Sequence, residues 1–343
     1  MAKVSFNTGM DIARIGACFM VVVLHVAAVN FDVFDERWWA SNFYDSLTRS
    51  CVPVFLMISG VLLLNKEEDL PEFFRKRFTR ILPPLLFWSL FYMAWNTSQG
   101  ENYGAWYKWI KTLASGPVVF HLWYLYAIVG IYLFVPFLRS IWLASSLAEK
   151  RMFLAFWMLV SAWPIVRTVF GINTDLLQTY ELGSFFGLIG YLFLGAYVFE
   201  AYQKKLPKNP YWWANVGFFV VFSTLTMTAT FAYSKHMDSP DSLFYDYLSP
   251  FVMAASVCVF NVLYGLGAKL KRYSAVLSQI SACTLGVYCL HIFVLQRIEG
   301  LTGLVDTNAS AWWTIPVTAC FVFAVSLGSI MVLRRFRPFL HVT

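Results

Sequence analysis

Residues 9–30 read GMDIARIGACFMVVVLHVAAVN, and this stretch decides the fold class. It matches the length of about 20 apolar residues that an α-helix needs to cross the hydrocarbon core of a bilayer. Asp11, Arg14 and His25 lie inside it, whereas the short apolar core of a cleavable signal peptide would exclude them. We therefore interpret it as a retained membrane-spanning helix.

Similar stretches recur along all 343 residues. Hydrophobic residues make up 59% of the chain and charged residues 13%, whereas a soluble domain has roughly 25% charged residues. The sequence predicts an all-α polytopic membrane bundle of about ten transmembrane helices, which forms one integral membrane domain over 1–343. The predicted helices lie near 9–30, 46–64, 79–98, 118–139, 152–171, 182–201, 211–233, 246–266, 278–298 and 311–333.

The positions of the charged residues predict the topology. Basic residues cluster after every second predicted helix, as at 75–80, 150–151, 269–272 and 334–337, and acidic residues fill the alternate junctions, as at 32–36. Because cytoplasmic loops carry the excess of Lys and Arg, both termini are expected in the cytoplasm. The net charge of +7 is scattered among apolar segments, so we expect no nucleic-acid partner.

Three ionisable residues in the first helix need an explanation, because each costs roughly 2.5–3.5 kcal/mol at the centre of a bilayer. Asp11 and Arg14 are three residues apart and can form an ion pair near the cytoplasmic end. Arg14 and His25 are eleven residues apart, which places them about 20° apart in rotation and about 16 Å apart in depth. The spacing lets both side chains line one channel, although a structural role for each is the simpler alternative.

Two further histidines are expected at the depth of His25. His121 begins the fourth predicted helix, and His291 lies well inside the ninth. A buried histidine is often a hydrogen-bonded structural residue, and three together also suggest a His₃ metal site. No carboxylate or Cys pair with ligand spacing accompanies them, so we expect no metal.

Several short strings, in this order, resemble the acyltransferase-3 family of membrane O-acyltransferases. The first is the pair Arg14 and His25, with ten residues between them. The others read VPVFLMISG at 52–60, RKRFTRILP at 75–83, HLWYL at 121–125 and GVYCLH at 286–291. The resemblance covers about residues 10 to 335. One departure is Val61, where many members carry an aromatic residue.

The resemblance implies a bacterial inner-membrane enzyme. Such an enzyme takes acetyl groups from cytoplasmic acetyl-CoA, as a co-substrate and without a permanently bound cofactor, and transfers them to a sugar hydroxyl of a glycan or lipid-linked glycan. The chain looks most like the short members that acetylate surface polysaccharide precursors, such as the enterobacterial common antigen O-acetyltransferases. His25 and Arg14 match the essential pair of the family.

A mechanism follows from these residues. His25 is expected to act as the general base on the acceptor hydroxyl, with an acetyl-imidazole intermediate as a variant. Supporting residues, including candidates for stabilising the oxyanion, are Asp11, His121, Tyr124, Tyr288 and His291. The expected acetyl-CoA-binding residues are Ser59, Arg75, Lys76, Arg77 and Arg80. A basic cluster at a cytoplasmic junction is otherwise an ordinary topological anchor.

Two other classes of function stay open on the sequence alone. A transporter or flippase of a lipid-linked sugar or a small anion would use the same intramembrane charges as an ion or substrate pathway. A structural subunit of a polysaccharide assembly complex would need no donor at all. The sequence also leaves open the acyl group, the modified hydroxyl, the side of the membrane that the acceptor occupies and the oligomeric state.

Overall fold

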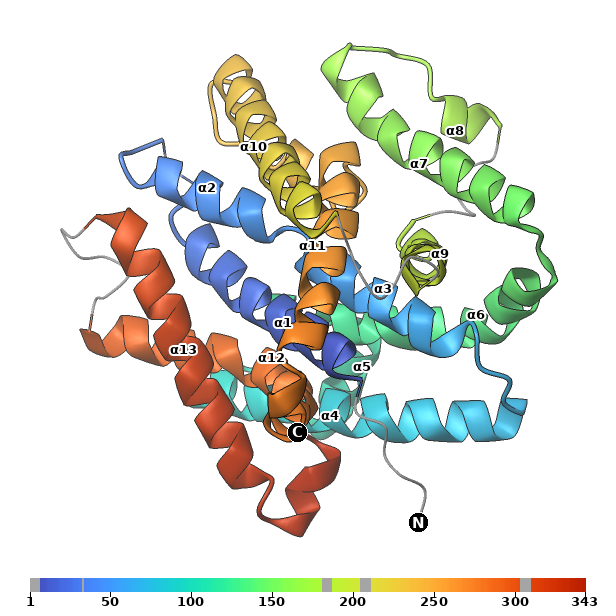
Figure 1. The fold of residues 1–343 in the computed structure, drawn as a ribbon. Helices are drawn as coiled ribbons and strands as arrows, with labels where there is room; N and C mark the ends of the chain where they lie inside the picture. The colour runs from blue at the N-terminus through green and yellow to red at the C-terminus, as the bar shows by residue number, and fades with distance from the viewer. Residues whose placement is uncertain (1–6, 33, 181–186, 204–210, 303–309) are drawn as a thin grey trace.

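The computed structural model describes residues 7–32, 34–180, 187–203, 211–302 and 310–343, and this part of the chain contains helices and no strand. Figure 1 shows the helices packed as one bundle. The α-helices are α1 (Thr8–Ala28), α2 (Trp38–Thr48), α3 (Cys51–Leu63), α4 (Leu70–Ser98), α5 (Trp106–Ser115), α6 (Trp123–Ala144), α7 (Leu147–Val169), α8 (Leu176–Thr179), α9 (Gly190–Gln203), α10 (Trp212–His236), α11 (Pro250–Lys269), α12 (Ser274–Thr302) and α13 (Ala311–Leu333).

Four short 3₁₀ helices complete the described structure, and three of them continue into candidate spans. They are η1 (Phe120–Leu122), η2 (Leu243–Tyr245), η3 (Lys271–Tyr273) and η4 (Arg337–His341). In the described residues, eight helical segments are long and apolar enough to cross a membrane. They are Thr8–Ala28, Trp38–Leu63, Phe120–Ala144, Leu147–Val169, Trp212–His236, Leu243–Lys269, Lys271–Ile298 and Ala311–Leu333. The predicted polytopic helical bundle is thereby confirmed.

Two of the ten predicted spans are absent from these eight. The span expected at 79–98 is the second part of α4, whose first turns carry the basic cluster at 75–80. The span expected at 182–201 corresponds to α9, and residues 181–186 lie outside the described part of the chain. The 14 residues of α9 reach only about 21 Å, which is shorter than the hydrocarbon core of about 30 Å.

The second predicted span begins earlier than the apolar pattern suggested. α2 starts at Trp38, and a break at Arg49 and Ser50 separates it from α3. α2 is more polar than α3 and buries Asn42 and Asp45 among its residues. Because polar side chains interrupt the hydrophobic run there, the sequence pattern reveals only the α3 half of this span.

α1 lies at the centre of the bundle, in contact with α2, α3, α11, α12 and α13 (Figure 1). Its buried residues include the small side chains of Ala13, Ala17 and Cys18, none of which is exposed. Small residues let transmembrane helices approach closely. Any polar side chain of α1 that points away from lipid therefore meets several other helices at once.

α3 and α9 approach more closely than a side chain would allow. A Cβ atom at Gly60 would lie 1.9 Å from the carbonyl oxygen of Leu192, and one at Gly195 would lie 2.3 Å from that of Met57. Only glycine fits at such a crossing. This contact fixes α3, which carries Ser59, against the interior of the bundle.

The ends of three helices meet where the basic residues gather. Arg139, near the end of α6, donates from Nε to the carbonyl oxygen of Leu63 at 3.0 Å and from Nη1 to that of Glu68 at 3.2 Å. The guanidinium thus satisfies a carbonyl that α3 leaves unpaired at its end. The predicted cytoplasmic location of this side and of both termini stays a prediction.

Candidate active site

A cavity of about 380 Å³ opens between α1, α3, α4, α6 and α12. This volume is within the range of about 300–1,000 Å³ that small-molecule sites occupy. The cavity has both cationic and aromatic walls, and none of its described lining residues is acidic. Its lining consists of Arg14, Phe55, Ile58, Ser59, Leu62, Leu63, Lys66, Arg77, Arg80, Ile81, Tyr124, Tyr132, Thr284, Leu285 and Tyr288.

Arg14 enters the cavity from the central helix. Its Nη1 donates to Ser281 Oγ at 3.4 Å and lies 3.7 Å from Asp11 Oδ1, so the ion pair expected from the sequence is present but long. The Arg14 side chain is 25% exposed and that of Asp11 is 12% exposed. Asp11 is outside the cavity lining, so the guanidinium keeps donors for an anion inside the cavity.

The basic residues at the start of α4 divide into two groups. Arg77 and Arg80 line the cavity, because residues three apart lie on neighbouring positions of one helix face. Arg75 and Lys76 are exposed and lie outside the lining. Of the residues predicted to bind acetyl-CoA, the structure therefore brings Ser59, Arg77 and Arg80 together around one cavity.

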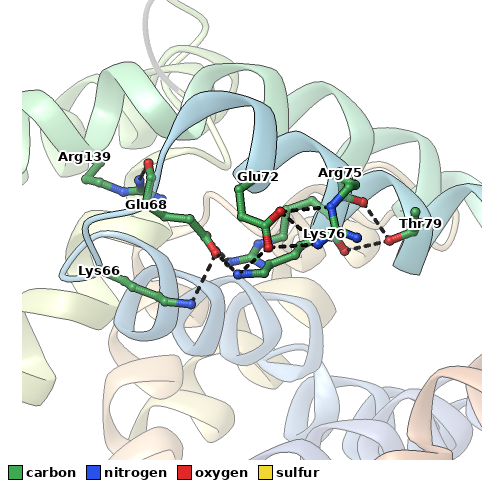
Figure 2. A network of polar contacts seen from close by, with 8 residues as sticks. Lys66, Glu68, Glu72, Arg75, Lys76, Thr79 and Arg139 are labelled. Carbon is green, nitrogen blue, oxygen red and sulfur yellow. Dashed lines mark hydrogen bonds and ion pairs between the residues drawn. The ribbon is translucent and has the colours of Figure 1, made fainter.

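Acidic partners hold the second group in place (Figure 2). Arg75 donates to both carboxylate oxygens of Glu72 at 2.9 Å, and Lys76 lies 2.6 Å from Glu68 and 2.9 Å from Glu72. Arg77, which belongs to the first group, also has an acidic partner, since it lies 3.1 Å from Glu68. Among the described residues Arg80 has no acidic partner, so it is the cation of this cluster whose charge is not neutralised locally.

Glu68 is the centre of this network and lies outside the predicted spans. The hydrogen bond from Lys76 is the main cause that lowers the pKa of Glu68 to about 2, and Lys66 and Arg77 act in the same direction. The contacts with Glu68 and Glu72 raise the pKa of Lys76 in turn. Glu68 is therefore ionised at every ordinary pH.

The three histidines predicted at one depth form a cluster. The ring centre of His25 lies 5.2 Å from that of His291, with the rings stacked, and 6.5 Å from that of His121. The centres of His121 and His291 are 5.3 Å apart. His121 and His291 are buried and His25 is half-buried. The described residues contain no group of three His, Cys, Asp or Glu side chains arranged to hold a metal ion.

Backbone carbonyl groups orient the two buried histidines. His121 Nε2 is 3.2 Å from the carbonyl oxygen of Cys289, and His291 Nδ1 is 2.6 Å from that of Tyr288. The Tyr288 hydroxyl donates to the carbonyl oxygen of His121. These contacts hold α12 against η1, the 3₁₀ helix that leads into α6, beside His25.

Tyr288 connects the cavity with the histidine cluster. It lines the cavity, and its ring centre lies 5.9 Å from that of His121 and 6.1 Å from that of His291. His25 itself is not a lining residue. Arg14 lines the cavity and His25 does not, so a channel shared by the two residues stays a prediction; the ring of Tyr288 lies beside both the cavity and the histidines.

Tyr124 is the other tyrosine at this end. It lines the cavity, its ring centre is 5.9 Å from that of Tyr288, and its hydroxyl has no hydrogen-bond partner among the described residues.

Sequence reasoning missed Lys66 and Tyr132, which also line the cavity. Tyr132 is eight residues after Tyr124 on α6, so helical periodicity would have placed both on one face.

A family model described as an acyltransferase domain matches residues 7–334. Searches of curated proteins and of solved structures found no match. The matched range contains the cationic cavity, the histidine cluster and all eight candidate spans. The chain therefore belongs to the acyltransferase-3 family of membrane acyltransferases.

Proposed function

We propose that this membrane acyltransferase is a bacterial inner-membrane O-acetyltransferase. It moves an acetyl group from cytoplasmic acetyl-CoA to a sugar hydroxyl of a surface polysaccharide or lipid-linked glycan precursor, as the enterobacterial common antigen O-acetyltransferases do. Both termini then lie in the cytoplasm. The observation that carries this proposal is the cationic cavity that ends at Tyr288, the residue whose ring neighbours the histidine cluster.

The charges of the cavity fit the donor. Coenzyme A carries a diphosphate and a 3′-phosphate, and a guanidinium binds phosphate oxygens through two parallel hydrogen bonds. Arg80, without an acidic partner in the described structure, and Arg77 are the residues proposed for these phosphates, while Lys66 adds charge at the same wall. The volume of about 380 Å³ suits the narrow acyl-pantetheine arm, so the nucleotide stays at the exposed mouth near α4.

Arg14 and the tyrosines form the inner part of the proposed donor site. Arg14 is placed to donate to the polar groups of the pantetheine arm as it passes α1. The thioester then ends near Tyr124 and Tyr288. Because the Tyr288 hydroxyl already donates to the carbonyl group of His121, we assign Tyr124 the role of hydrogen-bond donor to the oxyanion.

His25 supplies the base. Its neutral imidazole accepts the proton of the acceptor hydroxyl while the hydroxyl oxygen attacks the thioester carbon. The C–S bond breaks as the tetrahedral oxyanion collapses, and the leaving thiolate recovers the proton from the imidazolium. Direct transfer is proposed in preference to an acetyl-imidazole intermediate, because no second base is needed to complete it.

The experiment that tests this function uses the purified protein in detergent or nanodiscs. We expect it to bind CoA and to release free thiol from acetyl-CoA when a hydroxyl acceptor is present. A transporter or flippase would bind no CoA and release no thiol, and either result would end the proposal. Mass spectrometry of surface glycans from a deletion strain should show the polymer present without its acetyl groups, whereas loss of an assembly subunit would remove the polymer.

A further inference from the structure

Two buried nitrogen atoms in the histidine cluster have no hydrogen-bond partner within the part of the chain that the structure describes. They are Nδ1 of His121 and Nε2 of His291, on side chains that are 1% and 0% exposed. A buried polar atom without a partner is costly, and native structures keep few of them. Other buried side-chain atoms also lack a partner, but these two lie on neighbouring rings, 5.3 Å apart between centres, and both rings are neighbours of His25.

The backbone contacts determine the tautomer of both rings. A carbonyl oxygen can only accept, so His121 carries its proton on Nε2, which faces Cys289, and His291 carries its proton on Nδ1, which faces Tyr288. The two unpartnered nitrogens are therefore lone-pair acceptors. As neutral rings, neither histidine can donate a hydrogen bond to an oxyanion, which removes that role from both.

His25 is the donor within reach of these lone pairs. Both atoms are inaccessible to water, and the His25 ring stacks on His291 with 5.2 Å between centres. Two imidazoles joined by an N–H···N hydrogen bond of about 2.9 Å have ring centres roughly 5 Å apart. The distance between the ring centres of His25 and His291 matches such a contact, and a change of the His25 ring orientation is needed to direct an N–H at His291 Nε2.

A protonated His25 needs such an acceptor. An imidazolium in a buried site is unfavourable unless its N–H groups are hydrogen-bonded. Among the described residues, no carboxylate pairs with any of the three histidines, so the carboxylate partner of the Ser-His-Asp arrangement is missing. The lone pairs on the neighbouring rings are the acceptors present instead.

We propose that His291 and His121 are positioning residues that stabilise the imidazolium of His25 during acetyl transfer. His25 donates its other ring N–H to His291 Nε2, with His121 Nδ1 as a second acceptor nearby. The proton taken from the acceptor hydroxyl stays on the ring nitrogen of His25 that faces the acceptor. It returns to the CoA thiolate when the C–S bond breaks. This inference rests on the proposed function, and it assigns His291 the larger effect because its ring is nearer to His25.

Asparagine and glutamine substitutions separate the two ring nitrogens. The amide of asparagine reaches the Nδ1 position and that of glutamine reaches the Nε2 position. H291N keeps the donor to the Tyr288 carbonyl and loses the acceptor, whereas H291Q supplies an oxygen at the acceptor position. At residue 121 the roles are reversed, so H121Q keeps only the backbone contact and H121N supplies the acceptor.

We expect opposite orders of activity at the two positions. H291N and H121Q should lower kcat by about tenfold or more, with H291Q and H121N closer to the wild-type protein and the KM for acetyl-CoA unchanged in all four. A purely structural role predicts the reverse order at both residues, because the variant that preserves the backbone hydrogen bond would then be the active one.

The controls separate this inference from the proposed function. A wild-type protein that transfers no acetyl group from acetyl-CoA would refute the function itself. An active wild type with the reverse order, or with four variants of equal activity, would overturn only the positioning role. The two variants at each histidine give a separate order of activity. If the two variants at one position misfold, those at the other position still test the proposal. Misfolding of all four variants would show that both histidines are structural and would overturn the proposal.

Discussion

The two polar clusters of this protein are satisfied in different ways. At the start of α4, Glu68 and Glu72 contact four cations at 2.6 to 3.3 Å (Figure 2). In the histidine cluster, His121 Nδ1 and His291 Nε2 are buried and have no hydrogen-bond partner among the described residues. The first arrangement holds a helix end in position, and the second leaves hydrogen-bonding capacity unused inside the bundle. We propose that the second arrangement, beside His25, takes part in the reaction.

The two clusters differ in burial, and burial determines how strongly polar groups interact. Ion pairs near solvent contribute little each, typically about 0–1 kcal/mol, since water and salt screen them. Polar networks in a low-dielectric interior interact more strongly, and an unmatched group there is correspondingly costly. A single substitution around Glu68 should therefore change stability only slightly, whereas substitutions in the histidine cluster are expected to affect the proposed chemistry.

The largest effects are expected from Arg14→Ala and His25→Ala, each of which should abolish or nearly abolish transfer while the protein still inserts into the membrane. Loss of the general base should lower kcat for acetyl transfer by about 10²- to 10⁴-fold, while CoA binding, measured by calorimetry, is unchanged because His25 does not line the cavity. His236→Ala is the matched control, since His236 is exposed at the end of α10. Retained transfer in His25→Ala would remove this residue from the mechanism.

A smaller effect should divide the cations of the α4 cluster. Arg80→Gln should weaken CoA binding by about 10- to 100-fold, as expected for loss of a charged hydrogen bond, whereas Arg75→Gln should change it little because Arg75 is paired with Glu72 outside the cavity. Equal losses of CoA affinity in Arg75→Gln and Arg80→Gln would contradict the assignment of Arg80, and not Arg75, to the phosphates of CoA.

The smallest effect concerns the scaffold. Glu68→Gln should destabilise the protein by on the order of 1 kcal/mol without changing kcat. A pKa lowered from 4.5 to about 2 stabilises the folded state fully above about pH 4.5, and that contribution is lost as the pH falls toward 2.

Thermal unfolding in detergent between pH 5 and 2 measures this contribution. The decline in Tm should be shallower in Glu68→Gln than in the wild-type protein, because the variant has no carboxyl group to protonate at this position. Parallel declines in the two proteins would assign the acid sensitivity to other carboxylates.

Sequence periodicity was sufficient to predict the membrane bundle and some of the faces of its helices. Apolar length fixed most of the spans, and the separation of Arg14 from His25 placed both on one face of α1. Periodicity failed where polar residues interrupt a helix, as in α2, and where a helix is too short to span alone, as in α9. A hydrophobic pattern reports burial and not span length. Polar residues interrupt the pattern in α2, whereas α9 is apolar and buried but too short to span the bilayer alone.

The candidate site depended on contacts between distant segments. The sequence presented the basic residues at 75–80 as one cluster, and only the direction of the α4 face separated Arg77 and Arg80 from Arg75 and Lys76. It also predicted three histidines at one depth, but not the carbonyl groups of Tyr288 and Cys289 that fix their protons. Helix geometry is local and can be read from residue order, whereas the partner of each polar atom is decided only when α1, α6 and α12 pack together.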